Sequence, residues 1–402
     1  MKRIYEEILK KHLKTYDLMV FISGPRQVGK TTLAQMLVDI TDNYLYINWD
    51  NVDSREKVLS GPTKLVANLN LDKPHKKKPI LVLDEIHKYE QWSTFVKGLY
   101  DEYKNKIRII VTGSARLNIY RRGGDSLMGR YFLYRMHPLT VGELASNEVS
   151  KDLFRKPKKI SKKKLDQLFT FGGFPAPFLS NDEEFSNRWH DLRHQQVMNQ
   201  DLHDISNIHS IARIEVLIKI LRQQIGQLLN YSTLSNHLRV DDKTLRNWME
   251  ILEELFYSFR IQPWSKNIAR SLLKNPKLYL WDWSTVEEEG HKLENFVASH
   301  LLKAVHFWTD RGKGTYELYF IRDKDKHEVD FLVVENQEPF MLIEVKKSMK
   351  EPLSDNLKRF SKQISPKYTF QLAYDMPYID FDVRNLKEPM IIPMISFLSQ
   401  LP

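Results

Sequence analysis

The sequence predicts an α/β fold in which a parallel sheet is followed by a helical part and then by a second α/β part. Short apolar runs alternate with helical segments in the first part, and apolar residues recur at helical spacing in the middle. Near the end, strand-like runs with alternating side chains return. Because 402 residues exceed one ordinary core, we expect domains over residues 1–155, 156–265 and 266–402.

Four short apolar runs predict the strands of the first domain. They span residues 18–22, 44–48, 80–83 and 107–112. An amphipathic pattern over residues 3–14 predicts a helix ahead of the first strand. Polar residues follow the runs, and the carboxyl ends of parallel strands meet at one edge of a sheet. We therefore expect these polar residues to share one crevice.

The segment after the first predicted strand has the spacing of a phosphate-binding loop. It consists of Gly24, Pro25, Arg26, Gln27, Val28, Gly29, Lys30 and Thr31, with Thr32 next in the chain. The glycines let main-chain N–H groups close around phosphate oxygens, and the following helix adds its positive dipole end. Lys30 is expected to reach the outer phosphates, and the hydroxyl of Thr31 to bind a magnesium ion. The segment therefore predicts a site for ATP and Mg²⁺.

Two acids follow the third apolar run and predict the second half of the same site. We assign Asp84 to the metal ion and Glu85 to the attacking water. Such a pair can also start a helix, but the complete loop upstream favours the catalytic interpretation. Thr112 and Ser114 could contact the γ-phosphate, although a local turn explains Ser114 equally well. Arg130 is our candidate for neutralising the transferred phosphoryl group, in its own chain or from a neighbouring subunit.

The middle part has the pattern of a helix-turn-helix. A short and a longer helical stretch flank a turn at residues 240–242, and residues 256–263 are expected to add wing strands, giving a winged helix. Lys243 and Arg246 would face DNA at the start of the longer helix, but several acids on that helix also fit a protein-packing module. The Lys-rich stretch 155–164 is predicted to be a linker.

The last part predicts a hairpin and a third strand. These strands span residues 316–321, 327–334 and 340–347. Because side chains alternate along a strand, Glu328 and Asp330 share one face of the second strand, and Glu344 and Lys346 share one face of the third. Two carboxylates on adjacent strands, with a lysine two residues after the second, can bind Mg²⁺ and stabilise a pentavalent phosphate.

Together, the N-terminal motifs resemble a large archaeal and bacterial group of AAA+-like ATPases that carry a C-terminal domain of unknown function. The segments that carry the resemblance are residues 24–31, 83–86, 111–114, Arg130 with 138–144, and the Gly-Gly-Phe-Pro element at 172–175. The resemblance extends over essentially the whole chain. It implies an ATP-binding site and assembly into a ring or dimer.

The last part resembles a second group of proteins. Asp330, followed by Glu344-Val345-Lys346, is similar to the D…E-x-K signature of restriction-endonuclease-like and Holliday-junction-resolvase-like nucleases. In that fold a glutamate on the preceding helix often completes the metal site, and Glu294 holds the corresponding place. The resemblance implies a metal site at Glu294, Asp330 and Glu344, with Glu344 and Lys346 catalytic. A domain of this kind can also bind without cutting.

Composition narrows the classes of partner and compartment. The formal net charge of +10 favours DNA or another polyanion, although lysine runs also serve solubility. The absence of cysteine excludes disulfides, thiolate metal sites and cysteine nucleophiles. The N-terminus is charged, and no apolar run is long enough for a membrane helix. We therefore expect a cytoplasmic protein with no membrane partner.

The sequence leaves three function classes in competition. The favoured hypothesis is a Mg²⁺-dependent ATPase that self-associates and couples ATP hydrolysis to DNA binding or cleavage. The alternative is a nucleotide-driven switch or scaffold that recognises a protein partner, with the last part as a non-catalytic binding module. A kinase that transfers phosphate to a small molecule is less favoured, because Asp84 and Glu85 suit water activation.

Overall fold

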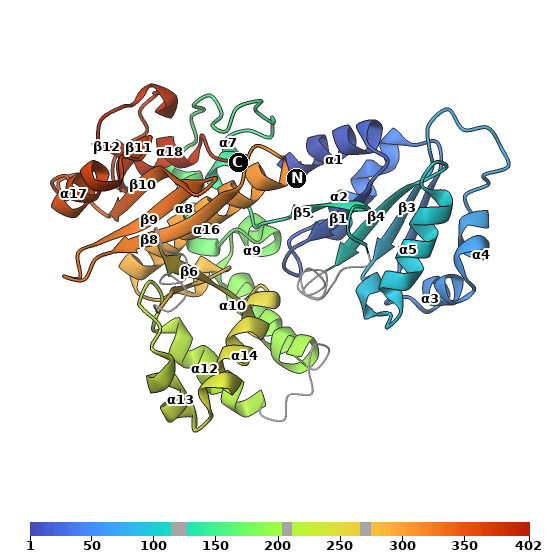
Figure 1. The fold of residues 1–402 in the computed structure, drawn as a ribbon, viewed down its shortest axis with the longest axis horizontal. Coiled ribbons are helices and arrows are strands. Elements are labelled where there is room, and N and C mark those ends of the chain that lie inside the picture. The colour runs from blue at the N-terminus through green and yellow to red at the C-terminus, as the bar shows by residue number, and fades with distance from the viewer. Residues whose placement is uncertain (114–126, 203–210, 266–274) are drawn as a thin grey trace. The chain divides into compact units, whose positions relative to one another are not determined.

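The computed structural model describes residues 1–113, 127–202, 211–265 and 275–402. The chain divides into two compact units, which we call unit 1 (Met1–His137) and unit 2 (Pro138–Pro402) (Figure 1). Within the described ranges, no helix combines the length and apolar character needed to cross a membrane.

Unit 1 is built on a five-stranded parallel sheet with the order β2-β3-β4-β1-β5 (Figure 1). Its strands are β1 (Met19–Ser23), β2 (Tyr44–Asn48), β3 (Ile80–Asp84), β4 (Arg108–Gly113) and β5 (Tyr131–Arg135). The first four confirm the four predicted runs. All residues of β1 and β3 are buried, as expected for parallel strands covered on both faces.

Helices cover this sheet. They are α1 (Ile4–Thr15), α2 (Lys30–Gln35), α3 (Val52–Leu59), α4 (Pro62–Ala67) and α5 (Trp92–Tyr103), with short 3₁₀ turns η1 (Met36–Ile40) and η2 (Ile86–Lys88). The predicted N-terminal helix is confirmed as α1, which buries Ile4, Leu9 and Leu13 on one side. Trp92 of α5 packs on Phe21 of β1, with ring centroids 6.3 Å apart.

The strand order brings the predicted site residues of unit 1 to one edge. Strand β4 lies between β1 and β3, with Gly113 beside Ser23 and Thr112 beside Asp84. The loop that follows Ser23 and the acid that ends β3 therefore flank the end of β4. This arrangement confirms the expectation that residues following the strands share one edge of the sheet.

Unit 2 contains a mixed seven-stranded sheet with the order β12-β11-β10-β9-β8-β6-β7. Its strands are β6 (Ser258–Pro263), β7 (Lys277–Leu280), β8 (Tyr316–Arg322), β9 (Glu328–Glu335), β10 (Glu338–Lys346), β11 (Tyr368–Ala373) and β12 (Met390–Pro393). Strands β8, β9 and β10 pair antiparallel in succession and confirm the predicted hairpin and third strand.

Some helices of unit 2 precede this sheet in the chain, and others lie between or after its strands. They are α7 (Val141–Ala145), α8 (Lys162–Phe171), α9 (Pro175–Ser180), α10 (Glu183–Gln196), α12 (Ile211–Arg222), α13 (Tyr231–Leu238), α14 (Asp242–Glu254), α16 (Glu289–Asp310), α17 (Asp355–Ile364) and α18 (Met394–Leu398). A π-helical segment, η4 (Val197–Asp201), follows α10, and two short 3₁₀ turns are η5 (Trp283–Thr285) and η6 (Val383–Asn385).

The two helices of the predicted helix-turn-helix are present as α13 and α14, and the winged helix stays a prediction. Asn230 and Asp241 cap these helices through their side chains. Strand β6, expected to be a wing strand, pairs antiparallel with β7 and also lies beside β8 in the seven-stranded sheet. Its Phe259 stacks on Tyr279 of β7, with the ring centroids 5.5 Å apart.

The break between the compact units falls after His137, whereas the first domain boundary was expected at residue 155. Arg155, in the expected linker, is buried and donates to the carbonyls of Gly142 (2.8 Å) and Ser146 (2.5 Å). Trp308 of α16 donates to the carbonyl of Leu153 at 3.0 Å. The start of the expected linker therefore belongs to the packed interior of unit 2. The division into three domains stays a prediction.

Candidate functional site

The loop after β1 needs its two glycines. Gly24 has a φ of +156°, and a Cβ there would lie 2.3 Å from the carbonyl oxygen of Met136. The loop is held this close because the N–H of Met136 donates to the carbonyl of Ser23 at 2.7 Å. Gly29 has a φ of +100°, in the left-handed region, directly before α2 begins. Both positions exclude a side chain for reasons of geometry.

Lys30 lies inside this loop. Its side chain is buried, and its ammonium group donates to the carbonyls of Gly24 (2.9 Å) and Pro25 (2.8 Å). Buried Arg3, next to α1, holds the loop from outside by donating to the carbonyl of Val28 at 2.9 Å and to that of His137 at 2.5 Å. The sequence analysis missed Arg3, because nothing in the local pattern links it to the loop.

Asp84 is oriented by three hydroxyl groups. Its Oδ2 accepts from Thr31 at 2.8 Å and also from Tyr46, while its Oδ1 accepts from Thr112. Asp84 is only 2% exposed. The direct contact of Thr31 with Asp84 places a hydroxyl and a carboxylate oxygen together, a donor set that suits Mg²⁺. The sequence analysis missed Tyr46 and the bond from Thr112 to Asp84.

Glu85 stands at the end of β3 in an unusual conformation. Its φ of +55° is in the left-handed region, and its N–H donates to the carbonyl of Thr112 at 3.0 Å. Burial raises the pKa of its carboxyl group, and this outweighs the opposing charge of Lys30. Oxygen Oε2 is buried and has no hydrogen-bond partner in the described part of the chain, while His87 Nε2 lies 3.4 Å away. Strain and an unbonded buried carboxylate oxygen are features of reactive positions.

Ser114 and Arg130 are the other two residues that the sequence predicted for this site. Ser114 lies outside the described residues. Arg130 lies at the opposite edge of the sheet, because its carbonyl accepts from the N–H of Met19, which begins β1. The five residues of β1 separate that edge from the loop by about 13 Å. Its guanidinium forms two hydrogen bonds to Asp101, at 2.8 and 3.1 Å.

A contact of Arg130 with phosphate in its own subunit is therefore excluded, and that part of the assignment is wrong. Arg130 comes directly before β5, which runs parallel to β1, whereas the phosphate loop comes directly after β1. The two therefore lie at opposite edges of the sheet. A role for Arg130 from a neighbouring subunit stays a prediction.

The predicted metal ligands of unit 2 are held by two adjacent strands, β9 and β10, and by helix α16. Asp330 of β9 accepts from the N–H of Val345 at 2.8 Å, and Glu344 of β10 pairs with Lys346 at 3.0 Å. Burial raises the pKa of both carboxyl groups; the neighbouring carboxylates raise that of Asp330 further, while Lys346 opposes the shift of Glu344. Oxygen Oε2 of Glu344 is buried without a hydrogen bond among the residues described.

A lysine that the sequence analysis missed stands among these acids. Lys277, the first residue of β7, places its ammonium 2.9 Å from Glu294, 2.7 Å from Glu328 and 3.9 Å from Asp330. Burial acts to lower the pKa of Lys277, but the three carboxylates outweigh it and raise the pKa. The ammonium takes the space between two of the three predicted ligands. The residues present therefore do not fit a divalent metal ion, and we derive no chemical step from one here.

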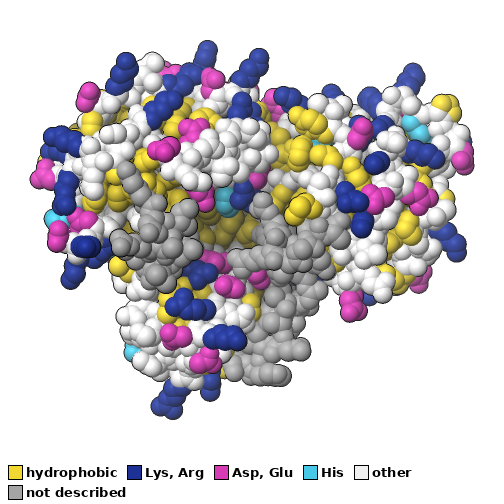
Figure 2. Space-filling view, in the orientation of Figure 1, with side chains coloured by type: hydrophobic (Ala, Val, Ile, Leu, Met, Phe, Trp, Pro, Cys, Tyr) yellow, Lys and Arg dark blue, Asp and Glu magenta, His cyan; other side chains and the backbone are white. Residues whose placement is uncertain are grey.

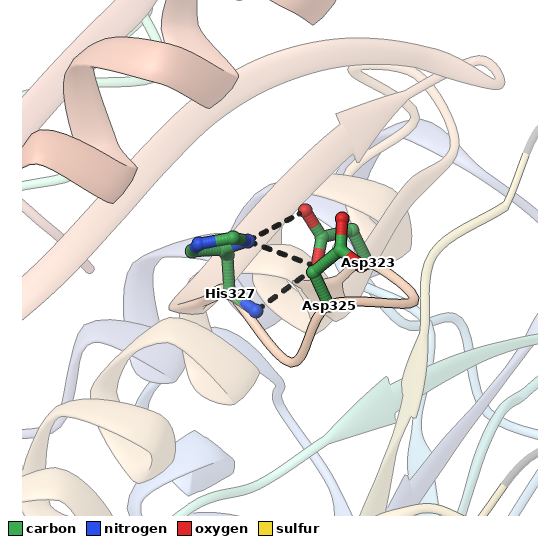
Figure 3. A group of neighbouring side chains, drawn as sticks. All are labelled: Asp323, Asp325 and His327. Atoms are coloured by element: carbon green, nitrogen blue, oxygen red, sulfur yellow. Dashed lines mark hydrogen bonds and ion pairs between the residues drawn. The ribbon is translucent and has the colours of Figure 1, made fainter.

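Another group of possible ligands lies at the turn between β8 and β9. Figure 3 shows Asp323, Asp325 and His327 with their side chains close together, and their ligand atoms lie within 4.8 Å of one another. Arg359 already contacts this group, at 2.8 Å from Asp323 and 2.7 Å from His327 Nδ1. A guanidinium thus balances the acidic charge, and we assign no metal to this group.

Sheet order, phosphate loop and the acids at the end of β3 give unit 1 a fold that resembles the P-loop domain of AAA+ proteins. Residues 16–145 match the family model described as AAA domain. Residues 162–287 and 289–376 match two models described as domains of unknown function, DUF8612 and DUF4143. The predicted nuclease resemblance of the last part therefore stays a prediction.

Relatives are found in bacteria and archaea. An uncharacterised protein of Mycobacterium tuberculosis is 22% identical over 321 residues, which is 75% of this chain and 67% of the relative. Two uncharacterised proteins of Methanocaldococcus jannaschii are 26% identical over 338 residues (79% and 72% covered) and 25% identical over 400 residues (88% and 82% covered).

Among solved structures, AMPPCP-bound DnaA from Aquifex aeolicus is similar with a TM-score of 0.30 and 14% identity, covering 63% of this chain and 88% of that one. C. elegans PCH-2 has a TM-score of 0.26 and 14% identity, covering 48% and 66%.

Proposed function

We propose that unit 1 hydrolyses ATP with water as the nucleophile, in a reaction that depends on Mg²⁺. The observation that carries this proposal is the buried Oε2 of Glu85, which has no hydrogen bond among the described residues and directly follows Asp84 in the chain. A carboxylate in this position can accept a proton from water. Its raised pKa makes it a stronger base than an ordinary glutamate.

Each residue of the site has a role in this reaction. Lys30 binds the outer phosphates, and phosphate oxygens replace the two loop carbonyls that its ammonium now contacts. Thr31 and Asp84 would hold Mg²⁺, which supplies positive charge to the phosphates when bound. Thr112 and Tyr46 keep the Asp84 carboxylate in place.

The chemical step follows from these positions. The oxygen of water forms a bond to the γ-phosphorus, the bond from that phosphorus to the β,γ-bridging oxygen breaks, and Glu85 takes a proton of the water. The products are ADP and inorganic phosphate. A P-loop kinase would instead pass the γ-phosphoryl group to another molecule, and the proposal excludes this outcome.

An isotope experiment tests the proposal. The purified chain is incubated with ATP in H₂¹⁸O with Mg²⁺ or with EDTA, and released phosphate is analysed by mass spectrometry. We expect one ¹⁸O per phosphate, formed only with Mg²⁺, and no phosphate release by Lys30→Ala. Phosphate release that needs an added acceptor, or none at all from a chain that binds ATP, would contradict the proposal.

For unit 2, the position of Lys277 supports the non-catalytic alternative. A metal-dependent nuclease needs its carboxylates to converge on a cation site, and an ammonium group already stands there. We therefore propose that ATP turnover in unit 1 drives a switch, and that unit 2 is a binding module. Self-association, a protein partner and a cytoplasmic location remain part of this proposal.

DNA is the second candidate ligand of unit 2. Lys243, Arg246 and Asn247 are exposed at the beginning of α14, where a helix-turn-helix presents base-reading side chains. Against this, on the face shown in Figure 2 the described lysines and arginines are interspersed with acids instead of gathering in one patch. Binding to a DNA duplex that weakens steeply with salt, and is lost in Arg246→Ala, would support DNA as the ligand.

A further inference from the structure

Three carboxylates of unit 2 share one buried ammonium group. Lys277 Nζ lies 2.7 Å from Glu328 Oε1, 2.9 Å from Glu294 Oε1 and 3.9 Å from Asp330 Oδ1, and the lysine side chain is 4% exposed. These acids come from β9 and α16, and the lysine comes from β7. The ammonium therefore joins three separate elements.

Each of these carboxylates also has a second donor. Glu294 Oε1 accepts from the hydroxyl of Tyr279 at 2.6 Å, and Glu328 Oε2 accepts from Arg322 at 2.6 Å. Asp330 Oδ2 accepts from the N–H of Val345 at 2.8 Å. Because Lys277 and Tyr279 are two residues apart, they share one face of β7. Strand β7 thus supplies both the cation and a supporting hydrogen bond.

A divalent ion cannot share this space with the ammonium. Mg²⁺ needs oxygen ligands at about 2.1 Å, and an ion bound to both Glu294 and Asp330 would stand close to Nζ. Repulsion between the two cations is strongest where water is excluded. The Lys277 side chain is buried, so its ammonium group reaches solvent only if the whole side chain leaves this position. The Nζ atom also lies 5.6 Å from the ring centroid of Phe320.

We propose that Lys277 is a built-in cation that takes the place of a divalent metal ion in unit 2. The acid cluster then binds no Mg²⁺ and does not cut DNA, and its charge is balanced by the protein itself. Glu344 is 7% exposed, and its Oε2 has no hydrogen bond in the described ranges. This carboxylate oxygen is therefore available to bind a metal ion once the ammonium group is removed. Replacing Lys277 by an uncharged side chain creates a metal site at Glu294, Asp330 and Glu344.

The test measures metal binding directly. The full chain is titrated with Mn²⁺ without nucleotide, and free Mn²⁺ is followed by its electron paramagnetic resonance signal. The proteins are wild type, Glu344→Gln, Lys277→Met and Lys277→Met with Glu344→Gln. Because these proteins differ only in unit 2, any Mn²⁺ bound by unit 1 is common to all of them.

We expect wild type and Glu344→Gln to bind Mn²⁺ equally. Lys277→Met should gain one site with an affinity at least about tenfold higher than any unit 2 site of the wild type, and the double variant should lose it. Mn²⁺ should also raise the melting temperature of Lys277→Met but not that of the double variant.

A wild-type Mn²⁺ site that Glu344→Gln removes would overturn the proposal, as would a folded Lys277→Met chain that gains none. If Lys277→Met does not fold, the comparison of wild type with Glu344→Gln still decides the matter. ATP hydrolysis by Lys277→Met should stay at the wild-type rate, so the failure of this inference is distinct from failure of the proposed ATPase.

Discussion

Gly24→Ala is expected to destabilise unit 1 and to abolish tight ATP binding. The added Cβ would lie 2.3 Å from the carbonyl oxygen of Met136, so either the loop or the end of β5 must move. Overpacking of this kind costs about 1–3 kcal/mol, and holding alanine at a φ of +156° costs about the same again. We therefore expect a loss of about 2–6 kcal/mol of local stability.

The matched control is Gly98→Ala in α5. A Cβ at Gly98 meets nothing within 4 Å, and the residue lies in the interior of a helix. Alanine there should stabilise the helix by about 1 kcal/mol. The assay is hydrogen exchange of peptides from β1 and β5, together with binding of a fluorescent ATP analogue. Equal protection and equal binding in Gly24→Ala and wild type would refute the reasoning about this loop.

Three further predictions concern single contacts. Arg3→Met removes one hydrogen bond to the loop carbonyl of Val28 and one to the carbonyl of His137, and it should lower ATP affinity at least about tenfold. An unchanged dissociation constant in a binding titration would count against this. Turnover should fall as the pH drops through the pKa of Glu85, because only the ionised carboxylate accepts a proton. Burial raises this pKa above its ordinary value of 4.5, so a pH–rate profile that is flat down to 4.5 would contradict the assignment. Glu143→Gln should destabilise unit 2 by about 3–5 kcal/mol because it removes the carboxylate that balances the buried charge of Lys303. Urea unfolding of that variant beside Glu143→Gln with Lys303→Met, which should recover part of the loss, tests this.

Local patterns were sufficient to predict the strand, loop and helix that form the candidate nucleotide site. The phosphate loop is one continuous segment, and the strand before it and the helix after it follow from apolar spacing. The contact of Thr31 with Asp84 also follows, because Thr31 comes after β1 and Asp84 ends the parallel strand β3, which places both at the same edge. Sequence order and strand direction together determine such contacts.

Contacts that depend on strand order could not be predicted in this way. Lys277 stands before a short apolar run and has the pattern of an ordinary strand start, so nothing in the chain links it to Glu328 fifty-one residues later. In the same way, nothing in the sequence of β6 indicates that this strand pairs with both β7 and β8. That pairing is a tertiary property.

Arg130 illustrates an error of a different kind. Its proximity in sequence to the fourth predicted strand suggested a place near the phosphates, but the direction of β5 puts it at the other edge of the sheet. A residue that precedes a parallel strand cannot lie with residues that follow one. Applying this rule to the sequence would have restricted Arg130 to a role in a neighbouring subunit.

The most direct test of the account compares Glu85→Gln with Glu90→Gln. Glu90 is exposed and lies five residues further along the chain, so its variant controls for the loss of one charge. Both variants are assayed for ATP binding and for single-turnover phosphate release. We expect Glu85→Gln to bind ATP like the wild type and to release phosphate about 10²–10⁴-fold more slowly, while Glu90→Gln stays at the wild-type rate. Wild-type hydrolysis by Glu85→Gln would contradict the assignment of Glu85 as the base that activates water.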